Sequence, residues 1–485
     1  MSLRKISRPK NAKSSDDCAA QVRTADSKRC DPRSRRPPHH RSQTSTSDVR
    51  AAASRLRSKR SRSLRFATGS KSKGIDMTQK PRKNRSTEGE KRMVKGSDLP
   101  HQFGLPIASD VTLDHIAALI PAAKRPLLMF GAAASRAVAS RPGLAADMAQ
   151  FVIRTGIPFL TTQMGKGTVP ENSHLYMGTP GLSEGEHVHE IIDKADLIMM
   201  IGHYTTEKPP FIMRPKGQTV IHIADLRAAF EPVYFPQFEV IGEIGHSLKA
   251  LADRLNGKLP NADALLPLRE EIPSRRSDRA DEKSWQITPQ RLVHDVRKVM
   301  PKNGIVALDN GRYKIDFARN YRTYLPNTLL LDNCFATMGA GLPSAITAAM
   351  LNPELRVMAV CGDGGFLMTC SEIETARRLK VNLVVIIVVD NAYGMISWKQ
   401  ASKGFPNFGT DFSNPDFVKL AEAFYAKGTR VETPDDLVPA LEAAFEGGGI
   451  HVVEVAIVYS DYKRVLTDKP RSRKTKPTKR LSDPG

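Results

Sequence analysis

Two short apolar runs in the second half of the chain each end at an acidic residue. They cover Val357–Cys361 and Leu383–Val389, and Asp363 and Asp390 follow them, 27 positions apart. Both runs are too short and too rich in β-branched residues for lone helices, so they are predicted to be buried strands, with a crossover helix at 371–380. Because open parallel sheets bind ligands at the carboxyl ends of their strands, both acidic residues are predicted to lie at a ligand site.

A second series of apolar runs occupies the segment from about Leu105 to Leu259. The runs Leu127–Gly131, Ala195–Gly202 and Thr219–Asp225 alternate with helical patterns. Strands that alternate with helices are typical of a parallel sheet. We therefore expect an α/β protein with two doubly wound parallel-sheet domains.

Composition adds two tails to these domains. The formal net charge of +22 first suggests a nucleic-acid-binding protein, but residues 101–462 alone carry a net charge of −4, so the basic residues are concentrated at the two ends. The predicted organisation is a disordered basic tail at 1–100, a central domain at 105–260, a charged linker at 261–285, a diphosphate-binding domain at 286–465 and a basic tail at 466–485.

The first ninety residues contain almost no apolar periodicity, which predicts disorder. Three interpretations stay open for them: a non-specific nucleic-acid arm, an organelle-targeting segment, or upstream sequence ahead of a true start near Met77 or Met93. No apolar run of about 18 residues predicts a membrane span. The five cysteines have no metal-binding or disulfide spacing, so the default expectation is a cytoplasmic protein with no membrane partner.

The residues around Asp363 suit a metal ion and a diphosphate. Mg²⁺ takes about six oxygen ligands and usually completes its shell with phosphates and water. Asp363 and Asp390, with a carbonyl from the following turn, would leave room for both. Gly362, Gly364 and Gly365 allow close approach and positive φ angles, so that backbone N–H groups can face the anion. Thr369, three residues before a glutamate, suggests a capping box for the crossover helix.

A plainer interpretation makes Asp363 the cap of a tight strand-to-helix turn. Asp390 and Asn391 would then belong to an ordinary loop. A Gly-Asp-Gly sequence alone favours this interpretation. The second acidic strand end, at the spacing found here, favours the metal site instead.

This arrangement resembles the thiamine diphosphate signature, in which Gly-Asp-Gly is followed some two dozen residues later by Asn. Over about 360 residues the chain is similar to acetolactate synthases, and the segments that carry the likeness are Asp309–Gly311, Phe335–Pro343, Gly362–Phe366, Glu372–Leu379 and Asp390–Met395. The resemblance implies magnesium ligands at Asp363, Asp390 and the carbonyl of Ala392, with Asn391 completing the motif.

The resemblance also assigns the residues around the organic part of thiamine diphosphate. Met338 matches the bulky residue that holds the cofactor bent, although the plain alternative is a core methionine that fills a gap. Ala336 would direct its carbonyl towards the aminopyrimidine ring. Met395 matches a residue near the substrate, and Trp398 lies one position from a tryptophan that influences substrate choice.

The central segment resembles the central domain of the same family. Thr161–Gly167 and the residues up to Gly181 carry this likeness, and some family members bind a non-redox FAD in this domain. Here Gly202–Lys208 replaces the arginine-bearing pattern of the flavin enzymes. The resemblance leaves FAD open without supporting it.

Family members also have a pyrimidine-binding domain whose glutamate protonates the cofactor. No segment before Leu105 resembles it, so the catalytic residues are unknown and we expect a fragment that needs a partner chain, besides a homo-oligomer. Three functions remain. The first is acetolactate-synthase-type decarboxylation and carboligation of pyruvate or another 2-ketoacid. The others are a different thiamine diphosphate 2-ketoacid decarboxylase or lyase, and a non-catalytic assembly module.

Overall fold

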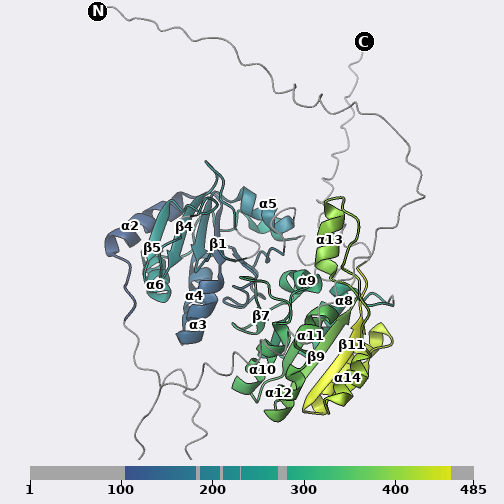
Figure 1. Cartoon of the computed structure of the whole chain (residues 1–485). Coiled ribbons are helices and arrows are strands. Elements are labelled where there is room, and N and C mark those ends of the chain that lie inside the picture. The colour runs from purple at the N-terminus through teal and green to yellow at the C-terminus, as the bar shows by residue number, and fades with distance from the viewer. Residues whose placement is uncertain are drawn as a thin grey trace, which may run out of the picture. The chain divides into compact units, whose positions relative to one another are not determined.

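The computed structural model describes residues 104–459, except 142, 182–185, 208–210, 230, 271–280 and 284. In this part of the chain, strands and helices alternate, and the strands form two parallel sheets with helices around them (Figure 1). The expected α/β fold with two doubly wound parallel-sheet domains is confirmed. The predictions for both basic tails and for most of the charged linker lie outside the described residues.

The first sheet has five strands in the order β2-β1-β3-β4-β5, and every neighbouring pair is parallel. Its strands are β1 (Pro126–Phe130), β2 (Phe159–Thr161), β3 (Leu197–Ile201), β4 (Thr219–Ala224) and β5 (Phe238–Ile241). In this order the chain reverses direction across the sheet between β1 and β3, which is where such sheets bind ligands.

Helices cover both faces of the first sheet because alternate strand residues point to opposite sides. One apolar cluster joins Phe130 and Ile201 to the helices α2, α3, α4 and α6, and the other joins Met129 and Met200 to α5. The helices of this domain are α2 (Asp110–Leu119), η2 (Ile120–Ala122), α3 (Ala132–Ser140), α4 (Leu144–Thr155), α5 (His187–Lys194), α6 (Ile244–Leu255) and η3 (Leu266–Glu270).

The second sheet has six parallel strands in the order β10-β11-β9-β8-β6-β7. They are β6 (Ile305–Leu308), β7 (Leu329–Leu331), β8 (Val357–Gly362), β9 (Leu383–Val389), β10 (Lys427–Arg430) and β11 (Ile450–Ala456). The chain passes from β6 outward to β7 and then returns to β8 on the other side of β6. The reversal point, and therefore the expected ligand crevice, lies between β6 and β8.

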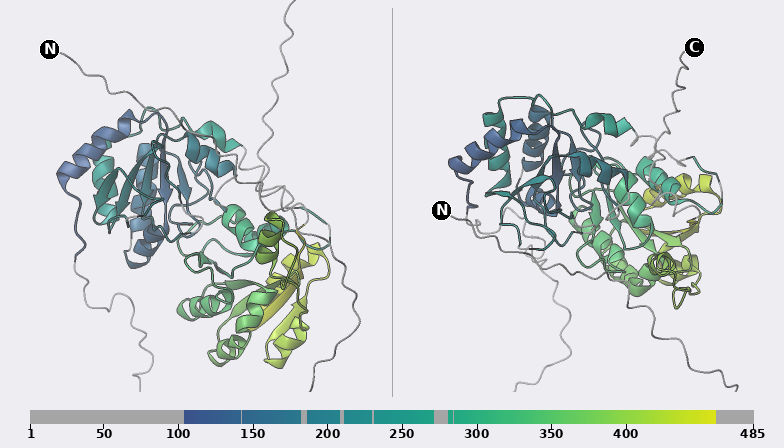
Figure 2. Two further views of the ribbon diagram at one scale, coloured as in Figure 1. Left: turned by 45° about the horizontal axis from the view of Figure 1, so that its top comes forward. Right: turned by 90° about the horizontal axis from the view of Figure 1, so that it is seen from above.

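Helices also cover both faces of the second sheet. One apolar cluster contains residues of α8, α9 and α15, and the other contains residues of α10, α11, α12 and α14. Figure 2 shows the ribbons of both sheets and their helices from two further directions. The helices are α8 (Pro289–Val299), α9 (Tyr313–Asn320), α10 (Gly341–Leu351), α11 (Asp363–Thr369), α12 (Glu372–Arg378), α13 (Gly394–Ser402), α14 (Phe417–Ala423), η4 (Pro434–Asp436) and α15 (Leu437–Glu446).

Local sequence signals explain where several helices begin. Thr288 caps α8 by accepting the N–H of Arg291, and Pro289 occupies the first helical position, where its missing N–H costs nothing. Asp416 caps α14 in the same way through the N–H groups of Val418 and Lys419. These caps orient helices that pack against the second sheet.

The segment between β8 and β9 confirms one prediction and corrects another. The crossover helix predicted at 371–380 is α12, Glu372–Arg378, and a further short helix, α11, precedes it from Asp363. The Thr369 capping box is wrong, because Ser371 precedes α12 without a side-chain cap and the Thr369 hydroxyl donates to the carbonyl of Gly339 at 3.0 Å. A contact with a distant loop satisfies that hydroxyl in place of the helix end.

No helix in the described part of the chain is long and apolar enough to cross a membrane.

Candidate functional site

A cavity lies at the reversal point of the second sheet. The segments that follow β6, β8 and β9 line it, together with one residue of the loop after β7 and one residue beyond β11. The lining residues are Asn310 to Tyr313, Met338, Gly362 to Gly365, Val388, Asp390, Ala392 to Ile396 and Tyr459. Strand ends that are far apart in the sequence therefore meet where the topology predicts a ligand site.

The glycines after β8 are required by close packing. A Cβ on Gly365 would lie 2.1 Å from Asp309 Oδ2, and one on Gly364 would lie 2.7 Å from the ring of Tyr393. The predicted positive φ angles are wrong: Gly362 has φ −71°, and neither Gly364 nor Gly365 is among the residues with positive φ. The absence of side chains, and not an unusual backbone conformation, explains this sequence.

Asp363 connects the ends of β8 and β9. The carboxylate is 1 % exposed, and its Oδ1 accepts the N–H of Gly364 at 2.8 Å. Its Oδ2 accepts the N–H groups of Asp390 at 3.2 Å and Asn391 at 2.7 Å. Asp363 is therefore held in one orientation with one lone pair of Oδ1 still available to a cation.

Asn414 is a fourth donor to this carboxylate, and sequence reasoning missed it. Its Nδ2 lies 2.8 Å from Asp363 Oδ2 and 2.9 Å from Asn391 Oδ1. It lies in the segment before α14, 51 positions from Asp363, and no motif marks it. The backbone of Asn391 has φ 55°, a conformation that Asn tolerates better than most residues, and its side chain contacts Asn414 without lining the cavity.

Asp390, the second acidic residue, lies where a negative charge is unfavourable. Burial, and next the negative charge of Asp363, raise the pKa of Asp390 to about 6, although Arg312 acts in the opposite direction. Two neighbouring carboxylates with an unfavourable charge are the arrangement that a bound cation relieves. The residues present thus fit a divalent cation held by Asp363 and Asp390.

Ala392, whose carbonyl is predicted as the third ligand, also lines the cavity. The described residues contain no group of three or more His, Cys, Asp or Glu side chains that could hold a metal ion. A magnesium ion here would need phosphate oxygens and water for its remaining ligands, as this ion usually does.

The other predicted cofactor and substrate residues divide into two groups. Met338 and Met395 line the cavity. Ala336 does not; it lies with φ 51° in an exposed loop beside Phe335, whose side chain is 87 % exposed. Trp398 is not a lining residue either, and it packs with Met395 against Ile315 of α9.

Arg312 brings a positive charge into the cavity and was missed by the sequence analysis. Its guanidinium carbon lies 4.0 Å from the ring centroid of Tyr459, a cation–π contact. A Cβ on Gly394 would lie 2.7 Å from both Arg312 Cδ and Asp390 Oδ2, so the arginine passes close to the second carboxylate. Its position one residue after the Asp309–Gly311 motif was the available signal.

Tyr313, the next residue, supports the floor of the cavity. Its hydroxyl accepts the N–H of Gly362 at 2.9 Å and donates to the carbonyl of Val360 at 3.3 Å. The ring is buried, and burial raises the pKa of this hydroxyl well above its usual value. Tyr313 is therefore neutral, and its hydroxyl supports the turn at Gly362–Gly365, called the glycine turn below.

The corresponding crevice of the first sheet is filled by a carboxylate of the chain. Glu207 is 2 % exposed, and its Oε1 accepts the N–H of Ala132 at 2.9 Å and of Tyr204 at 3.1 Å. Its Oε2 accepts the hydroxyl of Thr162. The carbonyl of Gly202 accepts the N–H of Ala133 at 2.8 Å. The first N–H groups of α3 are thus already bonded.

The hydrogen bonds at the start of α3 bear on whether FAD can bind in the first crevice. A dinucleotide places its diphosphate at the helix N-terminus beside this crevice and needs the free N–H groups there. Here those groups are used and a negative charge already lies among them. The residues present do not fit a flavin diphosphate at the start of α3.

Comparison with known protein families agrees with both domains. Residues 113–251 match the family described as "Thiamine pyrophosphate enzyme, central domain", and residues 309–455 match "Thiamine pyrophosphate enzyme, C-terminal TPP binding domain". The second match spans the strand ends that form the cavity.

Three curated relatives extend this similarity. The chain is 31 % identical over 373 residues to the acetolactate synthase of Bacillus subtilis, covering 75 % of the chain and 64 % of the relative. It is 33 % identical over 379 residues to the catabolic acetolactate synthase of Raoultella terrigena, covering 76 % and 66 %. It is 28 % identical over 370 residues to the 2-hydroxyacyl-CoA lyase of Arabidopsis thaliana, covering 71 % and 62 %.

The chain spans just under two thirds of the length of these relatives. Two domain matches in the expected order, with acetolactate synthases among the relatives, confirm the resemblance found in the sequence. The chain belongs to the thiamine pyrophosphate enzyme family.

Proposed function

We propose that this chain binds thiamine diphosphate through Mg²⁺ and takes part in acetolactate-synthase-type chemistry on pyruvate or another 2-ketoacid. The convergence of Asp363 and Asp390 in one cavity at the reversal point of the second sheet carries the proposal. The acetolactate synthases among the relatives support the choice of reaction.

Each residue at the cavity would have a distinct role. Asp363, Asp390 and the carbonyl of Ala392 would hold Mg²⁺, and the glycine turn would admit the diphosphate. Arg312 would offset negative charge near Asp390. When bound, thiamine diphosphate supplies a nucleophilic carbon that attacks the keto group of a 2-ketoacid. Met338 and Met395 would exclude water from that region and leave an apolar surface for a small substrate.

We further propose that turnover uses a glutamate from a pyrimidine-binding domain. No glutamate lines the cavity in the described part of the chain. General acid–base assistance of this kind is commonly worth about 10² to 10⁴ in rate. Acetolactate formation from pyruvate by the purified chain should therefore be slow. It should rise on adding a pyrimidine-domain polypeptide, whereas assembly into a homo-oligomer alone should not suffice.

A 2-hydroxyacyl-CoA lyase reaction is the second candidate. The relative from Arabidopsis thaliana favours it, and so does Arg312, a cation that can bind an anionic substrate group at the cavity. Product analysis separates the two: acetolactate from pyruvate supports the first, and an aldehyde released from a 2-hydroxyacyl-CoA supports the second.

Calorimetry tests the cofactor site directly. Thiamine diphosphate should bind the full chain in the presence of Mg²⁺ and show no heat of binding in EDTA, because the diphosphate is repelled by the two carboxylates unless a cation bridges them. Asp363→Ala should abolish binding, whereas Asp147→Ala, at an exposed position of α4, should leave it unchanged. Equal affinity in Mg²⁺ and EDTA would overturn the site assignment.

A further inference from the structure

The loop between β7 and α10 carries Met338 to the cavity, and its two ends are held differently. At its carboxyl end, the N–H of Gly339 donates to both carboxylate oxygens of Asp309, at 2.9 and 3.0 Å. The residues before it, 332–338, are called the 332–338 loop below. Ala336 in this loop has φ 51°, a conformation that costs energy for a residue other than glycine. The loop therefore needs other contacts to keep its shape.

Asp332 organises the loop from its first residue. Its carboxylate accepts the N–H groups of Cys334 at 3.2 Å, Phe335 at 3.4 Å and Thr337 at 3.1 Å. Burial alone would raise the pKa of Asp332, but these backbone donors lower it below its usual value. The ionised carboxylate is thus the centre around which the loop folds.

Lys314 of α9 links Asp332 to Asn310, a residue that lines the cavity. Its Nζ donates to the carbonyl of Asp332 at 2.7 Å and to the side-chain oxygen of Asn310. The amide nitrogen of Asn310 in turn donates to the carbonyl of Thr337 at 2.8 Å. One buried ammonium group therefore supports both ends of the loop, directly at Asp332 and through Asn310 at Thr337.

The environment of Lys314 shows that the contact is specific. The side chain is 7 % exposed, and burial lowers its pKa to about 8, although the charges of Asp332 and Asp309 act in the opposite direction. Near pH 7 most of the population is still protonated. A buried ammonium is costly unless its donors are used, and two of its three donors have named acceptors here.

Gln163 of the central domain holds the same loop from the other side. Its side-chain oxygen accepts Asn333 Nδ2 at 2.8 Å, and both side chains are at least 95 % buried. Its amide nitrogen donates to the carbonyls of Pro180 and Gly181 at 3.3 and 3.1 Å. The hydrogen bond joins residues 170 positions apart.

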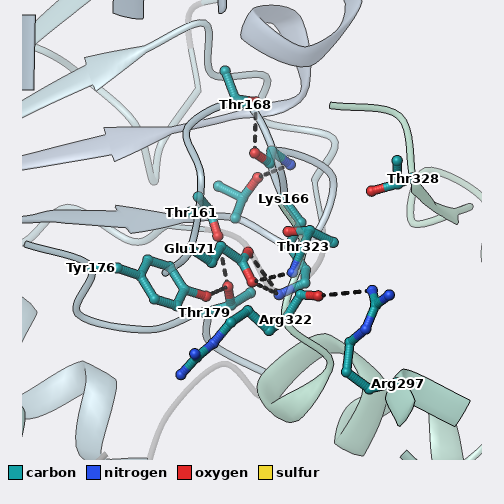
Figure 3. Close-up of polar contacts among 12 residues, drawn as sticks. Thr161, Lys166, Thr168, Glu171, Tyr176, Thr179, Arg297, Arg322, Thr323 and Thr328 are labelled. Carbon is teal, nitrogen blue, oxygen red and sulfur yellow. Dashed lines mark hydrogen bonds and ion pairs between the residues drawn. The ribbon is translucent and has the colours of Figure 1, made fainter. Parts of the chain in front are cut away.

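The turn that carries Gln163 is itself fixed against the diphosphate-binding domain. Lys166 donates to both carboxylate oxygens of Glu171 at 2.8 and 2.9 Å, and neither side chain is more than 1 % exposed. Glu171 also accepts the N–H of Thr323 at 3.0 Å and donates its own N–H to the carbonyl of Thr323 at 3.0 Å. Figure 3 shows Glu171 between Lys166 and Thr323. The buried contacts of Lys166, Glu171 and Thr323 therefore hold the turn that carries Gln163 in place.

We propose that Gln163 and Lys314 are positioning residues that hold the 332–338 loop, and with it Met338, at the wall of the cavity. Neither residue is among those that line the cavity in the described part of the chain, so each acts through another side chain. The inference rests on the proposed cofactor site and gives the central domain a part in it. In this proposal the central domain supports the cofactor loop through Gln163.

Hydrogen exchange in the cofactor-free full chain tests the proposal without reference to activity. Gln163→Met and Lys314→Met each remove hydrogen bonds to the loop, so the amides of Cys334, Phe335 and Thr337 should exchange roughly five- to tenfold faster. Lys314→Arg keeps donors for the same acceptors and should restore part of the protection. Gln150→Met and Lys249→Met, both at exposed positions, are the matched controls and should change nothing.

A second measurement separates positioning from general stability. Thiamine diphosphate affinity in Mg²⁺ should fall about tenfold in Gln163→Met and Lys314→Met, as expected when a binding surface is no longer preorganised. Gln163→Met leaves Asn333 Nδ2 and the carbonyls of Pro180 and Gly181 without this buried partner, so its melting temperature should fall, and the affinities are compared at a temperature at which every variant is folded.

The outcomes are distinct. Unchanged loop exchange in both variants would overturn the proposal, as would a uniform rise in exchange across both domains. If Lys314→Met does not fold, Lys314→Arg and Gln163→Met still decide it. A wild-type chain that binds no thiamine diphosphate would overturn the proposed function instead, while the exchange measurement would continue to decide the anchoring.

Discussion

The crevices at the reversal points of the two parallel sheets differ in the side chains that they contain. In the first sheet, the crevice between β1 and β3 contains Glu207, whose carboxylate takes up the first N–H groups of α3. In the second sheet, the crevice between β6 and β8 contains Asp363 and Asp390 facing a cavity. Both crevices hold carboxylates, and in the second the two carboxylates line a cavity formed by described residues.

The difference lies in what neutralises each carboxylate. Glu207 accepts donors on both oxygens and lies close to the first turn of a helix, so its negative charge stabilises the fold locally. Asp390 has a carboxylate neighbour and a raised pKa, so its charge destabilises the cofactor-free fold. In the first crevice the anion belongs to the chain and its charge is used within the fold, whereas two adjacent carboxylates face the second crevice, where we propose a cation. The predictions below test this contrast.

The largest stability effect should come from Glu207→Ala. The change leaves the N–H groups of Ala132 and Tyr204 and the hydroxyl of Thr162 without their acceptor, which should lower the free energy of unfolding by about 4 kcal/mol. Glu207→Gln keeps one acceptor oxygen and should lose less. Urea unfolding gives both values. Thiamine diphosphate affinity of the folded variants should be unchanged, and a large loss of affinity would contradict the contrast between the crevices.

The next effect is a gain in stability at Asp316 of α9. Burial, and to a lesser extent the charge of Glu186, raise the pKa of this carboxyl to about 7, while Arg319 and Arg312 oppose the shift. Between about pH 4 and pH 7, the folded chain binds a proton that the unfolded chain has lost, so stability falls as pH rises. Asp316→Asn removes this penalty and keeps the oxygen that accepts from Gln290.

The Asp316→Asn chain should therefore be more stable than the wild type by on the order of 3 kcal/mol above pH 7, with no difference below about pH 4. Asp295 is the control, since its carboxylate pairs with Arg291 at 2.6 Å. Asp295→Asn should destabilise the chain at neutral pH. Denaturant unfolding at a series of pH values tests both, and a gain independent of pH would refute the assignment to a titrating carboxyl.

A smaller effect should follow from filling the glycine turn. In Gly365→Ala the new methyl group would lie 2.1 Å from Asp309 Oδ2, so the turn must move. We expect a loss of about 2 kcal/mol in the free energy of unfolding and a fall in cofactor affinity. At Gly104 no heavy atom lies within 4 Å of an added Cβ, so Gly104→Ala should be neutral. Unaltered affinity in Gly365→Ala would show that the diphosphate does not approach this turn.

The smallest effect concerns pH and cofactor affinity. A proton on Asp390 competes with the metal, so the Mg²⁺-dependent affinity of the wild type should fall about tenfold per pH unit below pH 6. The diphosphate also takes up a proton at about pH 6, which affects all variants equally. Calorimetry between pH 5 and 8 should show a shallower dependence, from a lower affinity, in Asp390→Asn. Parallel profiles would exclude Asp390 as the competing group.

The strands and the family could be predicted from the sequence, because both depend on contiguous residues. Leu383–Val389 was predicted as a strand and is β9 with the same bounds. Such runs bury side chains on both faces, and burial is a local consequence of residue type. The Gly-Asp-Gly sequence likewise placed Asp363 at a strand end before any fold was known.

Long-range contacts could not be read from local patterns. Thr369 looked like a helix cap, but its hydroxyl bonds to Gly339, 30 positions away. The glycines were expected to adopt positive φ angles, but the close approach of Asp309 and Tyr393 requires them. Asn414 donates to Asp363 because the fold brings the two side chains together, and several other residue types could have supplied a donor at that position. No spacing rule could therefore have found Asn414.

The sequence by itself determined that this chain has two parallel α/β sheets and that acidic residues end two strands of the second. Only the tertiary structure decided that Glu207 fills the first crevice and that Lys314 and Gln163 support the loop beside the second, where Asp363 and Asp390 meet as the sequence had predicted. The physical reason is the distance along the chain over which each interaction acts. Hydrophobic periodicity acts along a few consecutive residues, whereas hydrogen bonds and charge pairs act between groups that only the folded chain brings within about 3 Å.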